Sequence, residues 1–272
     1  MTFDDQRLTG AEKTALLTLY GKALDARSSD PILGDTMAEQ AVRAMDFDFK
    51  SLKLPSGAAT SLPVRAKHLD DWTREFLAAH PKSTVLHLGC GLDTRVYRVD
   101  PPAGARWYDV DLPAVIELRQ ELYPPRADYE LVGASVIDPT WLHRIAGDRP
   151  VLVVAEGLVM HVPTAELVAL FRRITEKFPS GQVVFDVYSA STARFIMWSS
   201  RFGRTRVNLH WGLPAALKRE VPTLHLIDSV PYLTLPDLVS RLGRSAFSRA
   251  YFCAVAAGFM RNSMLHLRYQ FN

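Results

Sequence analysis

Short hydrophobic runs alternate with amphipathic stretches along most of this chain, and their order predicts an α/β protein. From about residue 80 onward, runs of strand length are separated by stretches whose hydrophobic residues recur three or four positions apart. The runs that predict strands are 84–88, 106–110, 129–133, 150–155, 182–188, 224–230 and 264–271. Strands that alternate with helices favour a mainly parallel, doubly wound sheet, and the last two runs suit a hairpin at its edge.

The N-terminal part of the chain predicts helices instead of strands. Stretches near 16–24, 37–45 and 65–79 are amphipathic with helical spacing, and proline or glycine separates them. The residues that share one face in the first of these stretches are Leu16, Leu17, Tyr20 and Leu24. We therefore expect a helical cap or lid over residues 1–80.

The rest of the chain, residues 81–272, is expected to form a Rossmann-like core. Within it, residues 189–222 follow no clear period in their first part, and we expect them to form an insertion that shapes a substrate pocket. Thr164 is suited to cap the helix that follows the fourth strand.

The first predicted strand leads directly into a glycine turn. Residues 84–88 are followed by Gly89-Cys-Gly91-Leu-Asp93-Thr94, and a helix-like segment begins there. Glycines in such a turn let backbone N–H groups approach a bound ligand closely. About twenty residues later the second strand ends in Asp111, where a nucleotide ribose would lie in such folds. The pattern predicts a nucleotide-like ligand.

Two cofactor classes compete for this turn. A dinucleotide fingerprint requires a third glycine for close packing of helix and strand, but Thr94 occupies that position. Asp93 would also place a negative charge beside a pyrophosphate. S-adenosylmethionine carries a sulfonium and no phosphate, so it tolerates that acid. We therefore favour S-adenosylmethionine over NAD or FAD.

Three motifs follow one another along the chain: Leu88-Gly-Cys-Gly-Leu-Asp-Thr-Arg95, Tyr108-Asp-Val-Asp-Leu-Pro113 and Val154-Ala-Glu-Gly-Leu-Val-Met160. In this order they resemble the leucine carboxyl methyltransferase family, which includes bacterial polyketide-type (tetracenomycin-like) O-methyltransferases. The resemblance extends to residues 20–33, to Arg65 and to the closing Leu267-Arg-Tyr-Gln-Phe271. It implies a class I methyltransferase fold with a seven-stranded, mainly parallel sheet and an N-terminal helical lid.

The same resemblance implies a set of cofactor-binding residues. Arg65 would pair with the carboxylate of the methionyl tail, since a guanidinium matches a carboxylate in two parallel hydrogen bonds. Asp111 would accept hydrogen bonds from the ribose hydroxyls, and Glu156 would receive the amino group of the tail. The remaining cofactor-binding residues are Gly89 and Gly91 at the tail, Leu112 on the adenine face, and Ser135 and Val136 in the loop after the third strand. Taken singly, Arg65 fits a surface arginine better than a ligand-binding one, and Asp111 is equally consistent with a turn acid.

The sequence departs from the family pattern at two positions. Ser135 stands where relatives usually carry an acid for the adenine amino group, and Asp138 is close enough in sequence to replace it. His161 stands where many relatives have tyrosine, and it is the candidate catalytic base, with capping or packing as the plainer alternative. The candidate substrate-pocket residues are Tyr20, Tyr188, Arg204, His210 and Trp211.

Composition and charge argue against several classes of partner, but they do not identify the methyl acceptor. The 272 residues carry a net charge of only +3 and no dense basic run, so a nucleic-acid partner is not expected. The acidic start is unlike a signal peptide, no run is long enough to span a membrane, and two separate cysteines suggest neither a disulfide nor a metal site. We expect a cytoplasmic monomer or homodimer, without a metal, that methylates a carboxylate or hydroxyl of a small molecule in secondary metabolism. A protein carboxyl methyltransferase, a non-catalytic cofactor-binding scaffold and a nicotinamide dehydrogenase are the alternatives.

Overall fold

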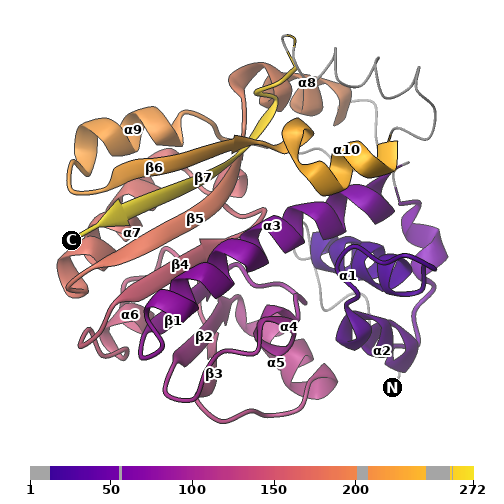
Figure 1. The fold of residues 1–272 in the computed structure, drawn as a ribbon, viewed down its shortest axis with the longest axis horizontal. Helices are drawn as coiled ribbons and strands as arrows, with labels where there is room; N and C mark the ends of the chain where they lie inside the picture. The colour runs from indigo at the N-terminus through magenta and orange to yellow at the C-terminus, as the bar shows by residue number, and fades with distance from the viewer. Residues whose placement is uncertain (1–12, 55–56, 201–207, 243–257, 259) are drawn as a thin grey trace.

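Seven strands form one sheet in a computed structural model that describes residues 13–54, 57–200, 208–242, 258 and 260–272. The strands are β1 Thr84–Leu88, β2 Arg106–Asp111, β3 Tyr129–Gly133, β4 Val151–Ala155, β5 Gly181–Tyr188, β6 His225–Pro231 and β7 Met264–Phe271. Their order across the sheet is β3-β2-β1-β4-β5-β7-β6 (Figure 1). All seven strands were predicted, with bounds within one residue.

Strands β1 to β6 all run in the same direction, and only β7 is reversed. β1 pairs in parallel with β2 and β4, and β7 lies antiparallel between β5 and β6. Strand order reverses between β1 and β4, because β2 and β3 continue to one side and β5 to the other. Ligands bind beyond the carboxyl ends of the strands at such a switch point.

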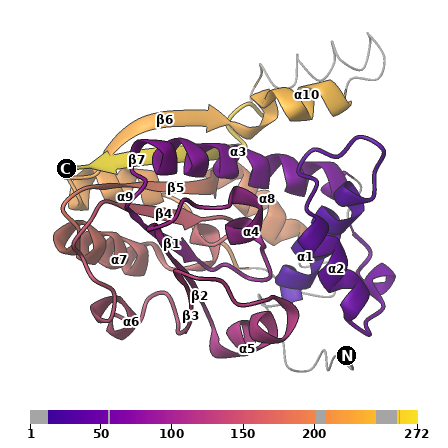
Figure 2. The same ribbon diagram turned by 60° about the horizontal axis from the view of Figure 1, so that its bottom comes forward.

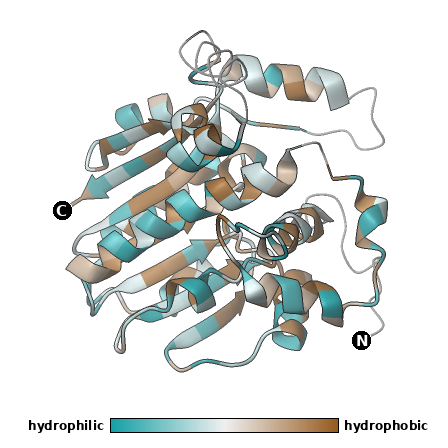
Figure 3. Ribbon diagram, turned by 45° about the vertical axis from the view of Figure 1, so that its right-hand side comes forward, coloured by the Kyte–Doolittle hydropathy of each residue, from teal (hydrophilic) through white to brown (hydrophobic). Residues whose placement is uncertain are grey.

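Helices cover both faces of the sheet, and the residues of the strands alternate between the two layers. Val85, for example, packs with the helix layer of α3 Ala58–Ala79 and α4 Arg95–Val99, whereas its neighbour Leu86 packs with the opposite layer. The opposite layer contains α6 Thr140–His143, α7 Thr164–Lys177 and α9 Leu213–Glu220. Figure 2 shows α3 and α7 on opposite sides of the strands, and Figure 3 shows hydrophobic segments along the central strands.

The N-terminal helices lie at the carboxyl edge of the sheet. α1 Lys13–Ala26 and α2 Thr36–Ala44 pack with α5 Pro113–Leu122 and with Leu92 of the glycine turn (Figure 1). In α1 the fully buried positions are Leu16, Leu19 and Ala23, whereas Leu17 and Tyr20 are half-buried, so the predicted buried face was displaced around the helix. The division into a lid over 1–80 and a core over 81–272 stays a prediction.

Two helices differ from the prediction. α3 begins at Ala58, seven residues before the expected stretch, because it accommodates Pro63 inside the helix. α8 Ala190–Ser200 occupies a segment for which no period was recognised. It buries only a narrow stripe at Ala193, and the hydrophobic residues that obscure the pattern, Phe195 and Trp198, are exposed.

The expected cap of α7 was also wrong. Pro163 is the N-cap residue, and Thr164 is the first residue of the helix, with its hydroxyl directed to the carbonyl oxygen of Trp211 at 3.4 Å. The remaining elements are the helix α10 Pro236–Leu242 and the short 3-10 helices η3 Phe49–Leu52, η4 Val159–His161 and η5 Tyr232–Thr234. Among the helices described, none is long and apolar enough to cross a membrane.

Candidate functional site

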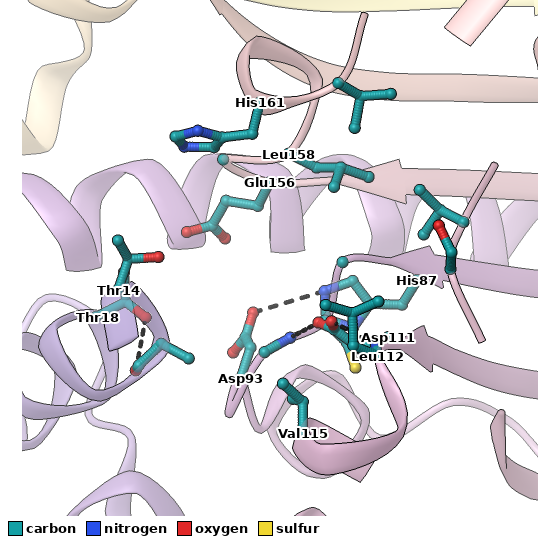
Figure 4. Close-up of a pocket in the computed structure, with 18 of the residues that line it drawn as sticks. Thr14, Thr18, His87, Asp93, Asp111, Leu112, Val115, Glu156, Leu158 and His161 are labelled. Atoms are coloured by element: carbon teal, nitrogen blue, oxygen red, sulfur yellow. Dashed lines mark hydrogen bonds and ion pairs between the residues drawn. The ribbon is translucent and has the colours of Figure 1, made fainter. Parts of the chain in front are cut away.

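A cavity of about 240 Å³ opens at the carboxyl ends of β1, β2 and β4. The glycine turn, the residues after β2 and the residues after β4 line it, and α1 covers one side. Figure 4 shows Glu156 and Asp93 directed toward a common space, with Thr14 and Thr18 of α1 beside them and Asp111 and Leu112 farther along. The cavity therefore has two chemically distinct ends.

The first end, which we call the charged end, is lined by Lys22, Arg65, Asp93 and Glu156, and it includes the fully buried Arg95 that contacts them from outside the cavity lining. Glu156 Oε1 accepts a hydrogen bond from Arg65 Nε at 3.0 Å, and Oε2 accepts one from Arg95 Nη2 at 2.5 Å. Lys22 Nζ lies 3.0 Å from Asp93 Oδ1 and 3.8 Å from Glu156 Oε1. Four separate parts of the chain, namely α1, α3, the glycine turn with α4, and the end of β4, thus meet through their charges.

The carboxylates of the charged end are held ionised. Burial alone would raise the pKa of Glu156, but the neighbouring Lys22, Arg65 and Arg95 lower it well below the usual range. Burial likewise opposes ionisation of Asp93, yet Arg98, Lys22 and Arg95 hold its pKa well below the ordinary value. Because each buried acid has basic partners, both carboxylates stay ionised, and this end of the cavity carries fixed positive and negative charges.

Further ion pairs hold Arg95 and the neighbouring Arg98 in place beside the charged end. The fully buried Arg95 donates through Nε to Asp70 Oδ1 at 2.6 Å, and Arg98 donates to Asp70 Oδ2 at 2.7 Å. Arg98 also pairs with Asp93 at 2.5 Å and with Asp35 at 2.9 Å. These contacts tie α2 and α3 to the helix that follows the glycine turn.

A second buried network holds the glycine turn onto the sheet. Arg119 of α5 donates to the carbonyl oxygens of Gly91 and Asp93 at 2.9 and 2.7 Å, and it pairs with Asp109 of β2. His87 lies between the networks: Arg95 Nη1 donates to its Nε2 at 3.2 Å, so Nδ1 carries the hydrogen that Asp109 accepts at 3.0 Å. The pKa of Asp109 is lowered to about 2, because Arg119 and His87 outweigh the effect of burial.

The second end of the cavity, which we call the edge end, consists of Asp111, Leu112, Ser135 and Val136 near β2 and β3. Asp111 Oδ2 accepts the N–H of Gly91, and Oδ1 accepts the N–H of Leu112, both at 2.7 Å. No side chain that carries a positive charge pairs with Asp111 among the described residues. Burial raises its pKa, and the two backbone hydrogen bonds oppose that rise.

The glycines of the turn are required by the protein itself. Gly89 and Gly91 both have a positive φ, and a Cβ at Gly89 would lie 2.7 Å from Leu158, whereas one at Gly91 would lie 3.3 Å from Ala15 of α1. Their N–H groups were expected to face a ligand, but Gly89 donates to Val110 and Gly91 to Asp111. Cys90 N also lies 3.4 Å from the Val110 oxygen. A turn whose donors are engaged in this way does not form the cluster of free N–H groups that binds a pyrophosphate.

The structure brings nine of the predicted site residues to this one cavity. They are Arg65, Gly89, Gly91, Asp111, Leu112, Ser135, Val136, Glu156 and His161. Asp138, the suggested substitute for Ser135, does not line the cavity; it is exposed and accepts the N–H of Thr140 at 2.9 Å instead.

The four predicted substrate-pocket residues in the described part of the chain do not line the same cavity. Tyr20 packs against Phe49 of η3, and Tyr188 packs beside Met160, Ala193 and Leu209. His210 and Trp211 border a separate, water-sized space against Val159 and Met160. Arg204 lies outside the described residues.

The contribution of α1 to the cavity was not predicted from the sequence. Thr14, Thr18 and Lys22 line the cavity at intervals of four residues along the helix. The contribution of α1 could have been predicted from these polar residues, which recur every four positions next to its buried face. His87 and Arg95 were also not assigned to the site, because their partners are distant in sequence and no local pattern identifies them. Asp93 was recognised in the glycine turn only as an acid that disfavours a pyrophosphate.

A family model described as leucine carboxyl methyltransferase matches residues 15–175. The chain belongs to the leucine carboxyl methyltransferase family. It is 42% identical over 234 residues to the tetracenomycin polyketide synthesis O-methyltransferase TcmP of Streptomyces glaucescens, a match that covers 85% of this chain and 87% of that protein. It is 38% identical over 198 residues to the S-adenosyl-L-methionine-dependent methyltransferase dpfgK of Gibberella zeae, with 66% of each chain covered.

Solved structures of methyltransferases share the fold. The N-methyltransferase NodS of Bradyrhizobium japonicum, in complex with S-adenosyl-L-homocysteine, has a TM-score of 0.51 at 15% identity and covers 89% of this chain and 99% of its own. Magnesium protoporphyrin IX methyltransferase (ChlM) of Synechocystis PCC 6803, with the same product bound, has a TM-score of 0.51 at 11% identity, with 88% and 94% covered. The predicted class I fold is confirmed. The family and its named members make the chain an S-adenosylmethionine-dependent O-methyltransferase.

Proposed function

We propose that this methyltransferase acts on a small molecule of secondary metabolism, at a carboxylate or hydroxyl oxygen, with the cofactor in the cavity between α1 and the sheet. The observation that carries the proposal is the pairing of a charged end and an edge end across one glycine turn, in which the N–H groups of Gly89, Cys90 and Gly91 are engaged within the protein. S-adenosylmethionine combines a zwitterionic tail with an adenosine and has no phosphate, so its parts match these two ends. The TcmP relative, named for polyketide synthesis, supports an acceptor of this class.

The residues at each end fit the cofactor's groups. At the charged end, the Arg65 guanidinium suits the tail carboxylate, and the ionised Glu156 suits the tail ammonium. At the edge end, Asp111 is oriented by two backbone N–H groups, which leaves its other lone pairs for the ribose hydroxyls. Leu112 is exposed enough to pack against adenine, and Ser135 offers a hydroxyl at its edge.

When bound, S-adenosylmethionine supplies a methyl group on a positively charged sulfur. The chain's own contribution is to position the acceptor and to exclude water, and positioning accounts for much of the rate of such transfers. α1 covers the cavity through Ala15 and Thr18, and the Lys22–Asp93 ion pair fastens it there. These contacts suit a cover that limits access of water to the charged end.

His161 is the candidate base for a hydroxyl acceptor. It lines the cavity above Glu156 (Figure 4), and its pKa is lowered by burial and by the nearby Arg65 and His210. A neutral imidazole at pH 7 can accept the proton of a hydroxyl. A carboxylate acceptor is already ionised and requires no base, so replacement of His161 by alanine distinguishes the two. A hydroxyl acceptor predicts a loss of about a hundredfold or more in kcat.

Calorimetry with S-adenosylhomocysteine tests the cofactor site directly. We expect micromolar binding by the wild-type protein and no binding of NAD. Heat with NAD and none with S-adenosylhomocysteine would contradict the proposal.

The second candidate is a protein carboxyl methyltransferase, which the family name itself favours. Incubation with methyl-labelled cofactor and either a metabolite extract or a set of peptides with free carboxyl termini separates the two. Label in a small molecule alone supports the proposal, and label in peptides alone overturns it. A cytoplasmic location and a monomeric or homodimeric state remain predictions of the sequence.

A further inference from the structure

A buried acid that the sequence analysis did not select lies directly behind the charged end. Asp186 is on β5 and is fully buried. β4 and β5 are parallel with Ala155 opposite Phe185, so the next residues, Glu156 and Asp186, lie side by side at the carboxyl edge. Both acids reach Arg65 of α3, which covers this face of the sheet. Asp186 is therefore a neighbour of the charged end by topology as well as by contact.

The two carboxylate oxygens of Asp186 have different partners. Oδ1 accepts the N–H of Gly157 at 2.6 Å, and Oδ2 lies 3.7 Å from Arg65 Nη1 and accepts no hydrogen bond. Gly157 has a φ of +66°, and a Cβ there would lie 3.3 Å from Arg65 Nη2. One side chain thus connects the turn after Glu156 with the arginine that packs against that turn.

The side of Asp186 toward β7 offers no compensating charge. His266 lies opposite Asp186 in the β5–β7 register and is fully buried, with neither ring nitrogen hydrogen-bonded. Burial, together with His68 and Arg65, lowers the pKa of His266 to about 3, so the ring is neutral near pH 7. His68 of α3 lies against it, with ring centroids 4.9 Å apart, and burial lowers its pKa as well. Within the described part of the chain, Arg65 is thus the one cation within 4.0 Å of Asp186.

We propose that Asp186 is a positioning residue that holds Arg65 at the cavity through Nη1 while the other nitrogens of Arg65 exchange Glu156 for a ligand carboxylate. In the structure, Nε and Nη2 of Arg65 both lie 3.0 Å from Glu156 Oε1, whereas Nη1 is directed to Asp186. Without Asp186, an arginine that released Glu156 would have no second anchor. The proposal rests on the proposed function, in which Arg65 takes the carboxylate of the methionyl tail.

Replacement of Asp186 by asparagine separates its charge from its structural role. The amide oxygen can still accept the N–H of Gly157, but the negative charge that faces Arg65 is lost. We expect D186N to bind S-adenosylhomocysteine about tenfold more weakly by calorimetry, because the buried negative charge that attracts Arg65 Nη1 is lost. Its melting temperature should stay close to that of the wild type. D148N, which removes an exposed acid paired with Arg106, is the matched control and should bind as the wild type does.

The pH dependence of binding supplies a readout that a purely structural role would not change. The groups that face Asp186 are Arg65 and His68 on α3, Glu156 after β4, Tyr188 on β5 and His266 on β7. Burial raises the pKa of Asp186, so its charge is lost earlier than that of an exposed acid as the pH falls. The wild-type affinity should therefore decline more steeply than that of D186N as the pH is lowered from 7 toward the ordinary pKa of an aspartate.

The outcomes distinguish this inference from the proposed function. If the wild-type protein does not bind S-adenosylhomocysteine, the proposed function fails. If the wild type binds and D186N binds equally well with the same pH profile, the positioning role is wrong. D186A removes the acceptor of the Gly157 N–H as well, so a lower melting temperature in D186A alone, with unchanged affinity in D186N, would also assign Asp186 a purely structural role.

Discussion

The two ends of the cavity are built in opposite ways. The charged end depends on residues far apart in sequence: Lys22, Arg65 and Arg95 come from three different helices and converge on Glu156 after β4. The edge end is local, because Asp111 is held by the N–H of the next residue and by the glycine turn of the adjacent strand. The charged end is therefore part of what holds the fold together, whereas the edge end is available to the ligand at little structural cost.

This difference predicts that mutations at the charged end mainly lower the stability of the fold, whereas mutations at the edge end mainly weaken ligand binding. A buried ion pair that loses one partner leaves an uncompensated charge, which is strongly unfavourable. A carboxylate that is held only by backbone N–H groups affects fewer neighbours when it is changed.

Replacement of Arg95 by methionine should destabilise the protein most. Arg95 is fully buried and contacts Asp70 at 2.6 Å, Glu156 at 2.5 Å and Asp93 at 3.4 Å. Its loss leaves three acids with fewer partners, and we expect the free energy of unfolding in urea to fall by about 3 to 5 kcal/mol.

The control for Arg95 is an arginine in an exposed pair. Arg43 lies 2.5 Å from Glu39 with 71% of its side chain exposed, so R43M should cost less than about 1 kcal/mol. Equal losses in R95M and R43M would show that the charged end does not support the fold.

Replacement of Glu156 by glutamine should give a stability loss that depends on pH. The pKa of Glu156 is lower in the folded protein than in the unfolded chain, so its contribution is fully present above about pH 4.3 and is lost as the pH falls below that value. We expect E156Q to be about 2 to 3 kcal/mol less stable than the wild type at pH 7 and the difference to shrink toward pH 3. Urea titrations at both pH values measure it.

An exposed glutamate provides the comparison for E156Q. Glu75 pairs with Arg268 at 2.7 Å, and 59% of its side chain is exposed. E75Q should have a small effect at either pH. If the E156Q difference were the same at pH 7 and pH 3, the ionised state of Glu156 would not be the source of the stability.

The same contrast explains what the sequence could predict. The strands were predicted because each is a short, hydrophobic run of adjacent residues. Asp111 and Ser135 were predicted because each stands at the end of a predicted strand or in the loop after it. The link from Asp70 through Arg95 to Glu156 joins residues up to 86 positions apart, and no local pattern encodes it. The helix α8 escaped recognition for a related reason, because only a narrow part of it is buried.

Replacement of Asp111 by asparagine should affect binding more than stability. One of its two backbone hydrogen bonds can persist, but an amide group accepts fewer hydrogen bonds than a carboxylate. We expect the Kd for S-adenosylhomocysteine to rise by about ten- to a hundredfold and the free energy of unfolding to fall by about 1 kcal/mol. D138N, at an acid that does not line the cavity, should bind like the wild type. Weak binding in D138N and normal binding in D111N would reverse the assignment of the edge end.

Replacement of Ser135 by aspartate should produce the smallest effect and the only gain. Ser135 lines the edge end where a carboxylate would be expected to accept a hydrogen bond from the adenine amino group. Hydrogen bonds to an ionised acceptor are about twice as strong as neutral ones, so S135D should tighten the binding of S-adenosylhomocysteine by about three- to tenfold in calorimetry. S135A should weaken it slightly, and adenosine alone should show the same order of affinities because the edge end does not contact the methionyl tail. If S135D bound more weakly than S135A, the adenine edge would lie elsewhere, and the edge end would have to be assigned to a different part of the ligand.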